Sequence, residues 1–488
     1  MNLVRNWKTL EPGLLGAVAV AAAILGGQAC WHVAPNSGTD SDAESDGQSD
    51  ASPAESAVPA EGSTGDSGDA GDAADVYVDS SQPFASSVIA AGLGFGCDIV
   101  QGQVWCWGDD TYGQAGSTPS STPVAHPQLV PLVPLVASDG GDAGDGGDAE
   151  AGPTGPVATA IALGDYHACA VTSTGAVYCW GLNTAYQLGH ASATSGDLIC
   201  PTAVPGQTVP CTSTPTLVAN VDPAQSIQAA GAWTCTVTST QGVQCWGAVQ
   251  PASVTDGGVA CGEGELAQGG ICYPAPYTVS GVTGVTQLAV GYDHACAIVP
   301  GVTADGGNQV ACWGSNNEGQ VSPSACPGSY CASPIARADL PTTTGLAAGD
   351  LFTCALDSTG IVRCFGDNTF GQLGHAPGTA GDLGVANPEA GLGIYNPTPS
   401  SVSSLGLAAS LVGGGNASAC ALIFGGAVQC WGDVSATGGA TPTPVTITGL
   451  PVMSSLGAFD STTACGLASD GTIWCWSIGP GPGATQIQ

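Results

Sequence analysis

The residues of this chain with the clearest chemical potential are its 21 cysteines. Fourteen of them form seven closely spaced pairs, which are Cys97 with Cys106, Cys169 with Cys179, Cys235 with Cys245, Cys296 with Cys312, Cys354 with Cys364, Cys420 with Cys430 and Cys465 with Cys475. Six more form three local couples, Cys200 with Cys211, Cys261 with Cys272 and Cys326 with Cys331. An even set of locally spaced cysteines behind an export signal is typical of a disulfide framework. Because no C-x-x-C pair occurs, zinc binding is the disfavoured alternative.

Histidine and aspartate side chains recur just before the first cysteine of several pairs. His167 and His294 stand two residues before it, where the other pairs have Phe95, Trp233, Phe352, Ser418 and Thr463. A position that accepts both histidine and aromatic residues indicates packing or a turn rather than catalysis. Asp165, Asp293 and Asp350 lie beside that position, and two carboxylates on one face could serve glycosidase chemistry, although loop capping is the favoured role. We therefore expect no catalytic residue, no bound cofactor or metal, and no enzyme activity.

The stretch IALGDYHACAVTSTGAVYCWGLNTAYQLG, residues 161–189, indicates the elements that must position these side chains. Its runs IALG, ACAVTS and AVYCWG are typical of short strands, and Gly175 marks a tight turn. If Cys169 faces Cys179 across a β-hairpin, the pairs 170/178, 171/177 and 172/176 fall in register. Gly175 then takes the positive φ that the three-residue loop needs. Directly opposed residues on antiparallel strands lie close enough for a disulfide.

Degraded copies of this unit recur from residue 89 to the end, one for each cysteine pair. Small β units that cannot bury both faces alone must stack on their neighbours, and copies separated by variable connections favour the blades of a propeller. We predict an all-β fold, a seven-bladed β-propeller of antiparallel sheets within residues 83–488. Every hairpin cysteine is expected to pair within its own blade. An aromatic residue follows the second cysteine of every pair, and it is expected to act as a wedge between adjacent blades: Trp107, Trp180, Trp246, Trp313, Phe365, Trp431 and Trp476.

The shared pattern of the copies is G-x-x-H-x-C-A, then G-x-V-x-C-W-G-x-N-x-x-G-Q-L-G. It resembles the regulator of chromosome condensation repeat family, in its bacterial, cysteine-paired form. The matching positions are Gly164, His167, Trp180, Gly181, Asn183, Gln187, Leu188 and Gly189, with Trp313, Gly314, Asn316, Gly319 and Gln320, and with Asn368, Gly371, Gln372, Leu373 and Gly374. The resemblance implies one closed ring over residues 86–477, because members of the family are seven-bladed propellers. The copies ending at Trp246, Trp431 and Trp476 lack G-Q-L-G.

The first 30 residues have the layout of an export signal. Arg5 and Lys8 precede an apolar run from Leu14 to Gly27, and Ala29 precedes Cys30. This layout resembles a bacterial lipoprotein signal, in which Cys30 would carry lipid and begin the mature chain. A plain secretory signal and an uncleaved membrane anchor are the alternatives. We expect export, with a membrane-anchored lipoprotein on the cell surface or facing the periplasm.

Two acidic, glycine-rich segments have too few large apolar side chains to offset the entropy cost of ordering. Residues 31–82 are expected to form a disordered tether that holds the folded domain away from the membrane. Residues 138–156 form an acidic loop insertion between the first two copies. Its Asp/Gly texture raises calcium binding as an alternative, but the nonapeptide spacing of calcium-binding repeats is missing, so a solvated loop is favoured.

The formal net charge is −35, from 39 acidic and four basic residues. Nucleic-acid binding needs a basic surface, so this composition excludes that class of partner and disfavours anionic lipids. Contact with a membrane is expected only through a lipid or an N-terminal anchor, and the domain is expected to be a monomer.

Three classes of function follow. A non-enzymatic cell-surface or secreted scaffold that binds a protein or glycan fits the export signal, the tether and the disulfides best. A secreted enzyme inhibitor is the second, because one beta-lactamase inhibitor is similar to this fold; an aromatic-rich patch on one ring face would favour it. Guanine nucleotide exchange, the activity of the family's eukaryotic namesake, is disfavoured, because an exported chain has no access to a nuclear GTPase.

The end of the chain raises the question of how the ring closes. After Trp476 the run GPGPG is too rich in glycine and proline for a long central strand. The last blade is therefore expected to lack an outer strand of its own, which would leave a sheet edge exposed. Residues 74–84, ADVYVDSSQPF, contain the only β-forming cluster of the tether and are predicted to pair with that blade.

Overall fold

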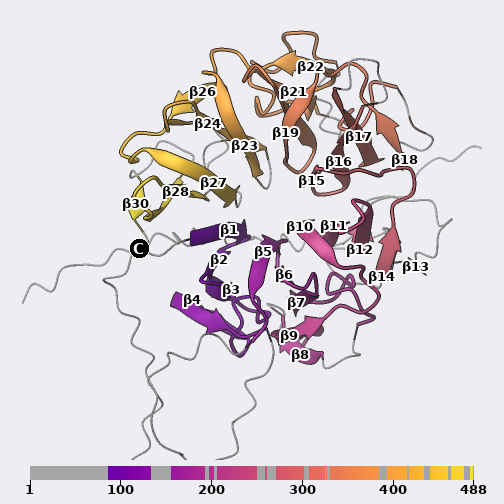
Figure 1. Cartoon of the computed structure of the whole chain (residues 1–488), viewed down its shortest axis with the longest axis vertical. Coiled ribbons are helices and arrows are strands. Elements are labelled where there is room, and N and C mark those ends of the chain that lie inside the picture. The colour runs from indigo at the N-terminus through magenta and orange to yellow at the C-terminus, as the bar shows by residue number, and fades with distance from the viewer. Residues whose placement is uncertain are drawn as a thin grey trace, which may run out of the picture.

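A computed structural model describes most of the chain from Ser86 onward (Figure 1). The described residues are 86–132, 155–192, 197–202, 206–249, 259–260, 271–301, 307–324, 326, 330–383, 393–414, 417–433, 440–459, 463–477 and 484–486. Within them every regular element is a strand, and the strands form seven antiparallel blades around a central axis. The prediction of an all-β, seven-bladed propeller is confirmed.

Each blade is built from one continuous stretch of sequence, and its first strand lies innermost. Blade 1 contains β1 (Ser86–Gly92), β2 (Phe95–Val100), β3 (Gln103–Asp110) and β4 (Ser120–Val130). Blade 2 contains β5 (Ala158–Leu163), β6 (His167–Thr172), β7 (Val177–Leu182) and β9 (Thr208–Leu217), with β8 (Leu198–Pro201) added outside β9. Blade 3 contains β10 (Ala224–Ala230), β11 (Trp233–Thr238), β12 (Val243–Val249) and β14 (Ile271–Thr278), with β13 (Val259–Ala260) at its edge.

The remaining blades each have four strands. Blade 4 contains β15 (Gln287–Val290), β16 (His294–Pro300), β17 (Asn308–Ser315) and β18 (Tyr330–Ala336). Blade 5 contains β19 (Thr343–Ala348), β20 (Phe352–Asp357), β21 (Val362–Asp367) and β22 (Tyr395–Ser401). Blade 6 contains β23 (Ala408–Gly414), β24 (Ser418–Ile423), β25 (Val428–Asp433) and β26 (Ala440–Thr446). Blade 7 contains β27 (Met453–Phe459), β28 (Thr463–Ala468), β29 (Ile473–Ser477) and β30 (Thr485–Gln486).

The central hairpin of blade 2 has the register that the cysteine spacing predicts. Cys169 lies opposite Cys179, with Ala170 opposite Tyr178 and Val171 opposite Val177. Gly175 has a φ of 82°, so it provides the left-handed residue of the three-residue loop. The other six hairpins place their cysteines opposite each other in the same way. Since the side-chain period of a strand is two, this one pairing sets which residues of each hairpin face the core.

The predicted wedge between blades is confirmed at six of the seven aromatic positions. Trp180 of blade 2 lies in one apolar cluster with Phe95 and Val104 of blade 1, and Trp246 lies likewise among residues of blade 2. The same relation holds for Trp313 with blade 3, Phe365 with blade 4, Trp431 with blade 5 and Trp476 with blade 6. All six side chains are almost fully buried. Burial of an aromatic ring removes a large apolar area from water, so stacking of blades is a main source of stability.

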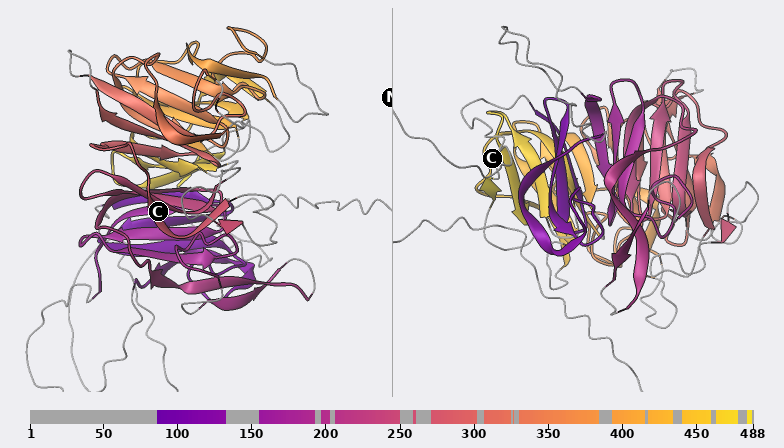
Figure 2. Two further views of the ribbon diagram at one scale, coloured as in Figure 1. Left: turned by 90° about the vertical axis from the view of Figure 1, so that its right-hand side faces the viewer. Right: turned by 90° about the horizontal axis from the view of Figure 1, so that it is seen from below.

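A repeated backbone hydrogen bond also joins neighbouring blades at the hairpin ends. The N–H of Ala158 donates to the carbonyl of Gly102, and Ala224 donates likewise to Gly175. Ala408 to Gly360 and Met453 to Gly426 repeat this bond in blades 5 to 7. In each case the donor is the first residue of the next inner strand. The blades therefore stand side by side with their strands running between the two faces of the ring (Figure 2).

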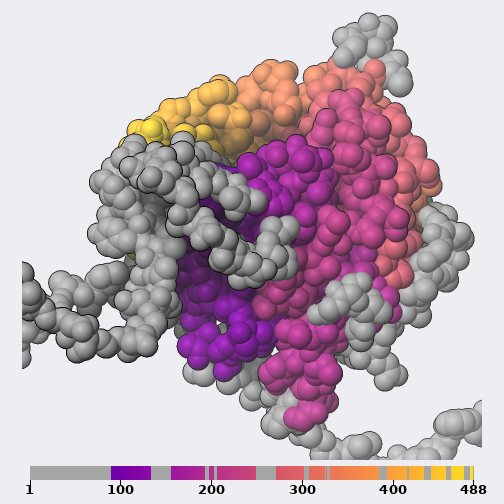
Figure 3. All heavy atoms as spheres, turned by 60° about the horizontal axis from the view of Figure 1, so that its bottom comes forward, coloured from indigo at the N-terminus to yellow at the C-terminus, as the bar shows by residue number. Residues whose placement is uncertain are grey.

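An arm formed by β8 and β9 projects from the rim of blade 2 (Figure 3). Leu198 and Ile199 on β8 are 51% and 75% exposed, and Cys200 is joined to Cys211 across the two strands. The insertion between the third and fourth strands of this blade is thus a stapled hairpin rather than an irregular loop.

The prediction about ring closure is wrong in one respect. Blade 7 has an outer strand of its own, because Thr485 pairs with Cys475 and Gln486 pairs with Trp474. This strand has two residues, which agrees with a glycine- and proline-rich run that cannot sustain a longer one. Residues 74–84 lie outside the described residues. The ring closes where β1 packs against β27, with Gly457 so close to Ile89 that a Cβ there would lie 2.1 Å from its side chain.

Candidate functional site

The two ends of the ring are built from different connections. Because Phe95 pairs with Gly108, the turn before β2 and the loop after β3 lie at the same end. We call this end the front face. In the described residues it comprises the turns 92–95, 164–167, 231–233, 291–294 and 349–352 and the loops 109–116, 182–189, 315–322 and 367–374. The hairpin loops between second and third strands form the opposite, back face.

A glutamine side chain shapes each of the four front-face loops. The Oε1 atom of Gln114 accepts a hydrogen bond of 2.8 Å from the N–H of Tyr112, and Gln187, Gln320 and Gln372 accept equivalent bonds from Ala185, Glu318 and Phe370. The backbone carbonyls of Gln114, Gln187 and Gln372 in turn accept the indole N–H of Trp180, Trp246 and Trp431. The G-Q motif therefore folds its own loop and also anchors the wedge of the next blade.

Aromatic side chains lie on these loops and on the neighbouring turns. The rings of Tyr112 and Tyr166 meet edge to face, with centroids 5.3 Å apart, across the boundary between blades 1 and 2. Phe370 occupies in blade 5 the position of Tyr112 and is 38% exposed, and Leu93 beside the axis is 40% exposed. Phe370 is thus exposed, and Tyr112 and Tyr166 are half-buried; aromatic groups at a protein surface are typical of interaction surfaces.

Carboxylates accompany the aromatic groups nearer the axis. Burial raises the pKa of Asp165 and raises that of Asp293 to about 6. Burial raises the pKa of Tyr292 as well, and the charges of Asp165, Asp350 and Asp293 raise it further. Asp165 and Asp350 occupy the same position of their repeats, whereas Asp293 stands one residue later. The structure thus brings the three aspartates of the sequence pattern to one end of the axis.

Glu318 replaces Tyr112 and Phe370 at the equivalent position in blade 4. Its side chain is 5% exposed, and burial, followed by the charge of Asp367, raises its pKa to about 7. The sequence did not predict the raised pKa of Glu318, because it depends in part on Asp367, which belongs to the next blade.

Both described arginines form ion pairs away from the front face. Arg337 is 1% exposed, contacts both carboxylate oxygens of Asp339 at 2.9 Å and stacks on the ring of Phe365. Arg363 pairs with Asp357 near the back face. No lysine or arginine of the described residues therefore presents its charge on the front face, which is acidic and aromatic.

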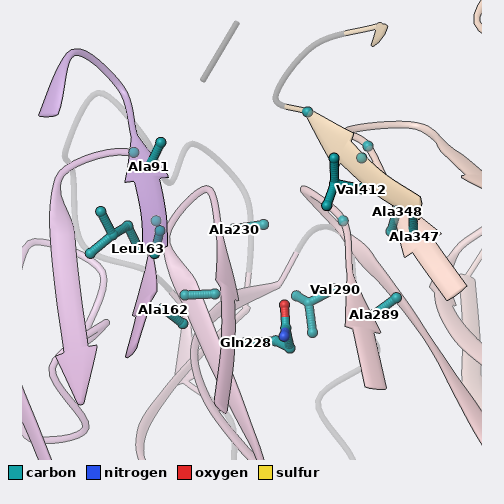
Figure 4. Close-up of a pocket in the computed structure, with 18 of the residues that line it drawn as sticks. Ala91, Ala162, Leu163, Gln228, Ala230, Ala289, Val290, Ala347, Ala348 and Val412 are labelled. Carbon is teal, nitrogen blue, oxygen red and sulfur yellow. The ribbon is translucent and has the colours of Figure 1, made fainter. Parts of the chain in front are cut away.

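A cavity of about 440 Å³ follows the axis and extends to the front face, where turn residues line it. Its walls are the inner strands of all seven blades, and most side chains that line it are apolar. Figure 4 shows Ala91 and Leu163 on one side and Val412 and Ala348 on the other, with Gln228 between them. At the front face the wall contains Leu93, Asp165, Tyr292 and Asp350.

The histidines two residues before a cysteine have the structural role that the sequence indicates. The Nε2 atom of His167 lies 2.8 Å from Thr234 Oγ1 of the next blade, and His294 lies 2.8 Å from Thr353 Oγ1. Both histidines are fully buried, and burial lowers their pKa values to about 3 and about 4. Each is therefore a neutral hydrogen-bonding partner between blades.

Sequence reasoning missed one cluster that has the composition of a catalytic triad. His375 Nε2 lies 2.8 Å from Asp382 Oδ1, and His375 Nδ1 lies 3.4 Å from Ser400 Oγ. Asp382 also accepts hydrogen bonds from Asn368 and from the N–H of Gly378. Blade 2 repeats part of the arrangement, because Asn183 donates to Asp197 at 2.9 Å and His190 Nε2 lies 3.7 Å from Asp197 Oδ1. Recurrence at the base of two G-Q-L-G loops indicates a structural cross-link, and the shared letters G-H and G-D-L in both copies were the available signal.

The cysteines of the seven hairpins have their sulfur atoms joined within each blade. Their Cα atoms lie 4.0–4.1 Å apart, as expected for directly opposed residues of two antiparallel strands. The seven bridges are Cys97 to Cys106, Cys169 to Cys179, Cys235 to Cys245, Cys296 to Cys312, Cys354 to Cys364, Cys420 to Cys430, and Cys465 to Cys475.

Of the six cysteines in the insertions, the structure describes five. Cys200 is joined to Cys211, and Cys326 to Cys331. Cys272 is buried on β14 and is disulfide-bonded, but Cys261, the partner that the sequence predicts for it, lies outside the described residues. The pairing of Cys261 with Cys272 therefore stays a prediction.

Several predicted features fall outside the described part of the chain. They are Cys30, the export signal, the tether and most of the acidic insertion. Among the residues that the structure does describe, no group of His, Cys, Asp and Glu is suited to a metal ion, and no helix is long and apolar enough to cross a membrane.

Comparison with known proteins agrees with this architecture. Models of the regulator of chromosome condensation (RCC1) repeat match residues 158–187 and 344–372 in one version and residues 174–238 in another. No curated protein sequence matches the chain. The matched residues lie in blades 2, 3 and 5; they include the Y-Q-L-G segment 186–189 of blade 2 and extend to Gln372 in blade 5.

Solved structures extend the likeness to the whole ring. Prp20p from Saccharomyces cerevisiae is 18% identical with a TM-score of 0.57, over 82% of this chain and 87% of that protein. Human WBSCR16 is 16% identical with a TM-score of 0.54, over 79% of this chain and 94% of that protein. At these identities the likeness concerns the fold. The chain therefore contains regulator of chromosome condensation repeats in blades 2, 3 and 5, and it shares its propeller fold with these solved structures.

Proposed function

We propose that this protein is a non-enzymatic, exported scaffold whose front face binds a protein partner with a basic surface. The observation that carries the proposal is the composition of that face, where Tyr112, Tyr166 and Phe370 stand among carboxylates and none of the described loop residues is a lysine or arginine. Aromatic side chains supply contact area, and the unbalanced negative charge selects and steers a cationic partner. A glycan that stacks on the aromatic rings is the other partner this surface would suit.

The rigidity of the front face supports a binding role. Its loops are held by the glutamine side chains and by the wedge of the next blade, so little ordering entropy is lost when a partner binds. The solved relative Prp20p is described by its binding to Gsp1p and histones, which supports protein binding as the use of this fold. The matched motif residues have structural roles in this chain, so they give no support to nucleotide exchange.

Export and lipid attachment at Cys30 complete the proposal. The many cysteines placed for disulfides fit an oxidising compartment. Mass spectrometry of the N-terminal peptide from the native membrane tests the lipid directly. A mature chain that begins at Cys30 with an acyl mass is expected, and an unmodified Cys30 would contradict the anchor without affecting the front face.

The test of the binding face compares two variants of the mature domain in pull-downs from its native cell surface, followed by affinity measurement with the captured partner. Tyr112→Ser combined with Tyr166→Ser should weaken binding at least tenfold. The control is Phe424→Ser, because Phe424 is 66% exposed on the back face. Equal affinity of the front-face variant and the wild type, with both folded by circular dichroism, would show that the face is not the contact.

A secreted enzyme inhibitor is the second candidate. The edge-to-face pair of Tyr112 and Tyr166, with Phe370 on the same face, is the aromatic-rich patch that such an inhibitor needs. Titration of a serine beta-lactamase with the purified domain tests it. Inhibition that the Tyr112→Ser, Tyr166→Ser variant loses would favour this function, and full enzyme activity at saturating domain would exclude that target.

A further inference from the structure

We propose that the front end of the axial cavity is a binding site for a small organic cation with an apolar body, such as an alkylammonium ion. The inference concerns the axis of the ring and is independent of the protein partner proposed above. It follows from the lining of the cavity, from the groups at its mouth and from the absence of a described cation beside them.

The body of the cavity suits an apolar chain. Its volume of about 440 Å³ lies within the range of small-molecule sites, roughly 300–1,000 Å³. Ala91, Ala162, Leu163, Val290 and Val412 present aliphatic groups from four different blades (Figure 4). An alkyl chain in the cavity would remove these aliphatic groups from water.

The mouth suits a positive charge. The ring of Tyr292 lies over Gly231 of the preceding blade, where a Cβ would stand 2.9 Å from the ring, so only glycine gives the tyrosine this place. Asp165 and Asp350 flank this tyrosine in the ring: the N–H of Asp165 donates to the carbonyl of Gly231, the N–H of Tyr292 donates to the carbonyl of Asp350, and all three residues belong to the cavity wall. An ammonium group at this point would meet two carboxylates and the face or edge of a phenol.

The charges at the mouth of the cavity favour a cationic ligand over an anionic or a neutral one. Arg337 is buried against Asp339 and Arg363 pairs with Asp357, so neither of the described arginines reaches the mouth. A carboxylate ligand would face Asp165 and Asp350 with like charge. A bound cation would also favour the ionised form of Asp165, whose pKa burial raises, so binding should release protons near the pH at which this group titrates.

The experiment uses isothermal titration calorimetry on the mature domain with hexyltrimethylammonium as the probe and hexanoate and hexanol as matched controls. We expect saturable binding of the cation, and binding of hexanoate and hexanol at least tenfold weaker. The variants Asp165→Asn and Tyr292→Leu should each weaken the cation at least fivefold. Asp470→Asn, in the hairpin loop between β28 and β29 at the back face, is the charge-matched control and should leave the affinity unchanged.

A cavity-filling variant tests the apolar half of the site. Val412→Phe should weaken hexyltrimethylammonium but not tetramethylammonium, which needs only the mouth. Melting temperatures and near-ultraviolet circular dichroism confirm that each variant is folded. The proposal is overturned if the wild-type domain binds none of the cations, if hexanoate binds as tightly as the cation, or if folded Asp165→Asn binds with wild-type affinity.

Discussion

His167 of blade 2 and Thr234 of blade 3 share a buried hydrogen bond of 2.8 Å between Nε2 and Oγ1, and His294 repeats it with Thr353 from blade 4 to blade 5. The equivalent residues are phenylalanine in blades 1 and 5 and tryptophan in blade 3, where Trp233 donates to the carbonyl of Gly291 instead. One position therefore supplies either a ring that packs or a polar group that bridges to the next blade.

Replacing both histidines should change how stability depends on pH. Burial lowers the folded-state pKa values to about 3 for His167 and about 4 for His294, below the ordinary 6.5. The unfolded state therefore takes up protons first as pH falls, and stability is lost from about pH 6.5 downward until the folded-state values are reached. Between pH 7 and pH 5 this should cost roughly 2 kcal/mol for each histidine.

Urea unfolding of the wild type and of a His167→Phe, His294→Phe variant at both pH values measures this loss. Buried carboxylates such as Asp98, whose pKa burial raises to about 6, change stability in the opposite direction in both proteins and cancel in the difference. The variant should lose less stability than the wild type on acidification. Parallel pH profiles would contradict neutral, buried histidines.

Removing a wedge residue should uncouple two blades. Trp180 is fully buried, and its indole N–H donates 3.0 Å to the carbonyl of Gln114 in blade 1. Trp180→Ala should cost about 3–5 kcal/mol of unfolding free energy, because it leaves a cavity between the blades and an unpaired carbonyl. Trp105→Ala, at a half-buried tryptophan on β3, is the control and should cost clearly less. Equal losses of unfolding free energy would mean that Trp180 contributes no more to stability than Trp105.

Asp382 should prove more important than its place in a surface loop suggests. Its carboxylate accepts from Asn368 Nδ2, His375 Nε2 and the N–H of Gly378, at 2.8 to 2.9 Å. Asp382→Ala leaves these donors without their partner and should cost roughly 2 kcal/mol or more. Thermal unfolding of this variant should show a lower melting temperature, whereas Asp470→Asn should leave it unchanged. Because we interpret the cluster as a cross-link, Ser400→Ala should have only a small effect on stability.

Two front-face loops should respond differently to substitution at the same position of the repeat, Gly371 in blade 5 and Tyr186 in blade 2. Gly371 has a φ of 81°, and a Cβ there would lie 2.6 Å from Cα of Pro442 in the next blade, whereas Tyr186 adopts a φ of 62° at the same position of blade 2. Gly371→Ala should therefore destabilise the protein by more than the ~1–2 kcal/mol of the left-handed conformation alone. Tyr186→Gly should change stability by less than about 1 kcal/mol, because strain relief and added unfolded-state entropy oppose each other. Chemical denaturation of both variants measures the contrast, and a neutral Gly371→Ala would contradict the close approach.

Local patterns predicted the parts of this molecule that depend on neighbours in sequence. The pairing of Cys169 with Cys179 follows from strand alternation, and the wedge role of Trp180 follows from its recurrence. The short strand β30 could not be predicted, because two residues carry no periodicity and Gly-Pro runs indicate a loop. The meeting of Asp165 with Tyr292 also could not, because it depends on the rotation from blade 2 to blade 4, which no local pattern encodes.

Because each of the seven blades is completed by strands of its own stretch, blade 1 and blade 7 exchange no strand, and in the described residues β1 meets β27 by packing alone. Trp107, the aromatic residue of blade 1, is only half-buried, whereas the other six are almost fully buried. Because this junction has no almost fully buried aromatic wedge, a mechanical load is expected to separate blades 1 and 7 before any other pair of neighbouring blades.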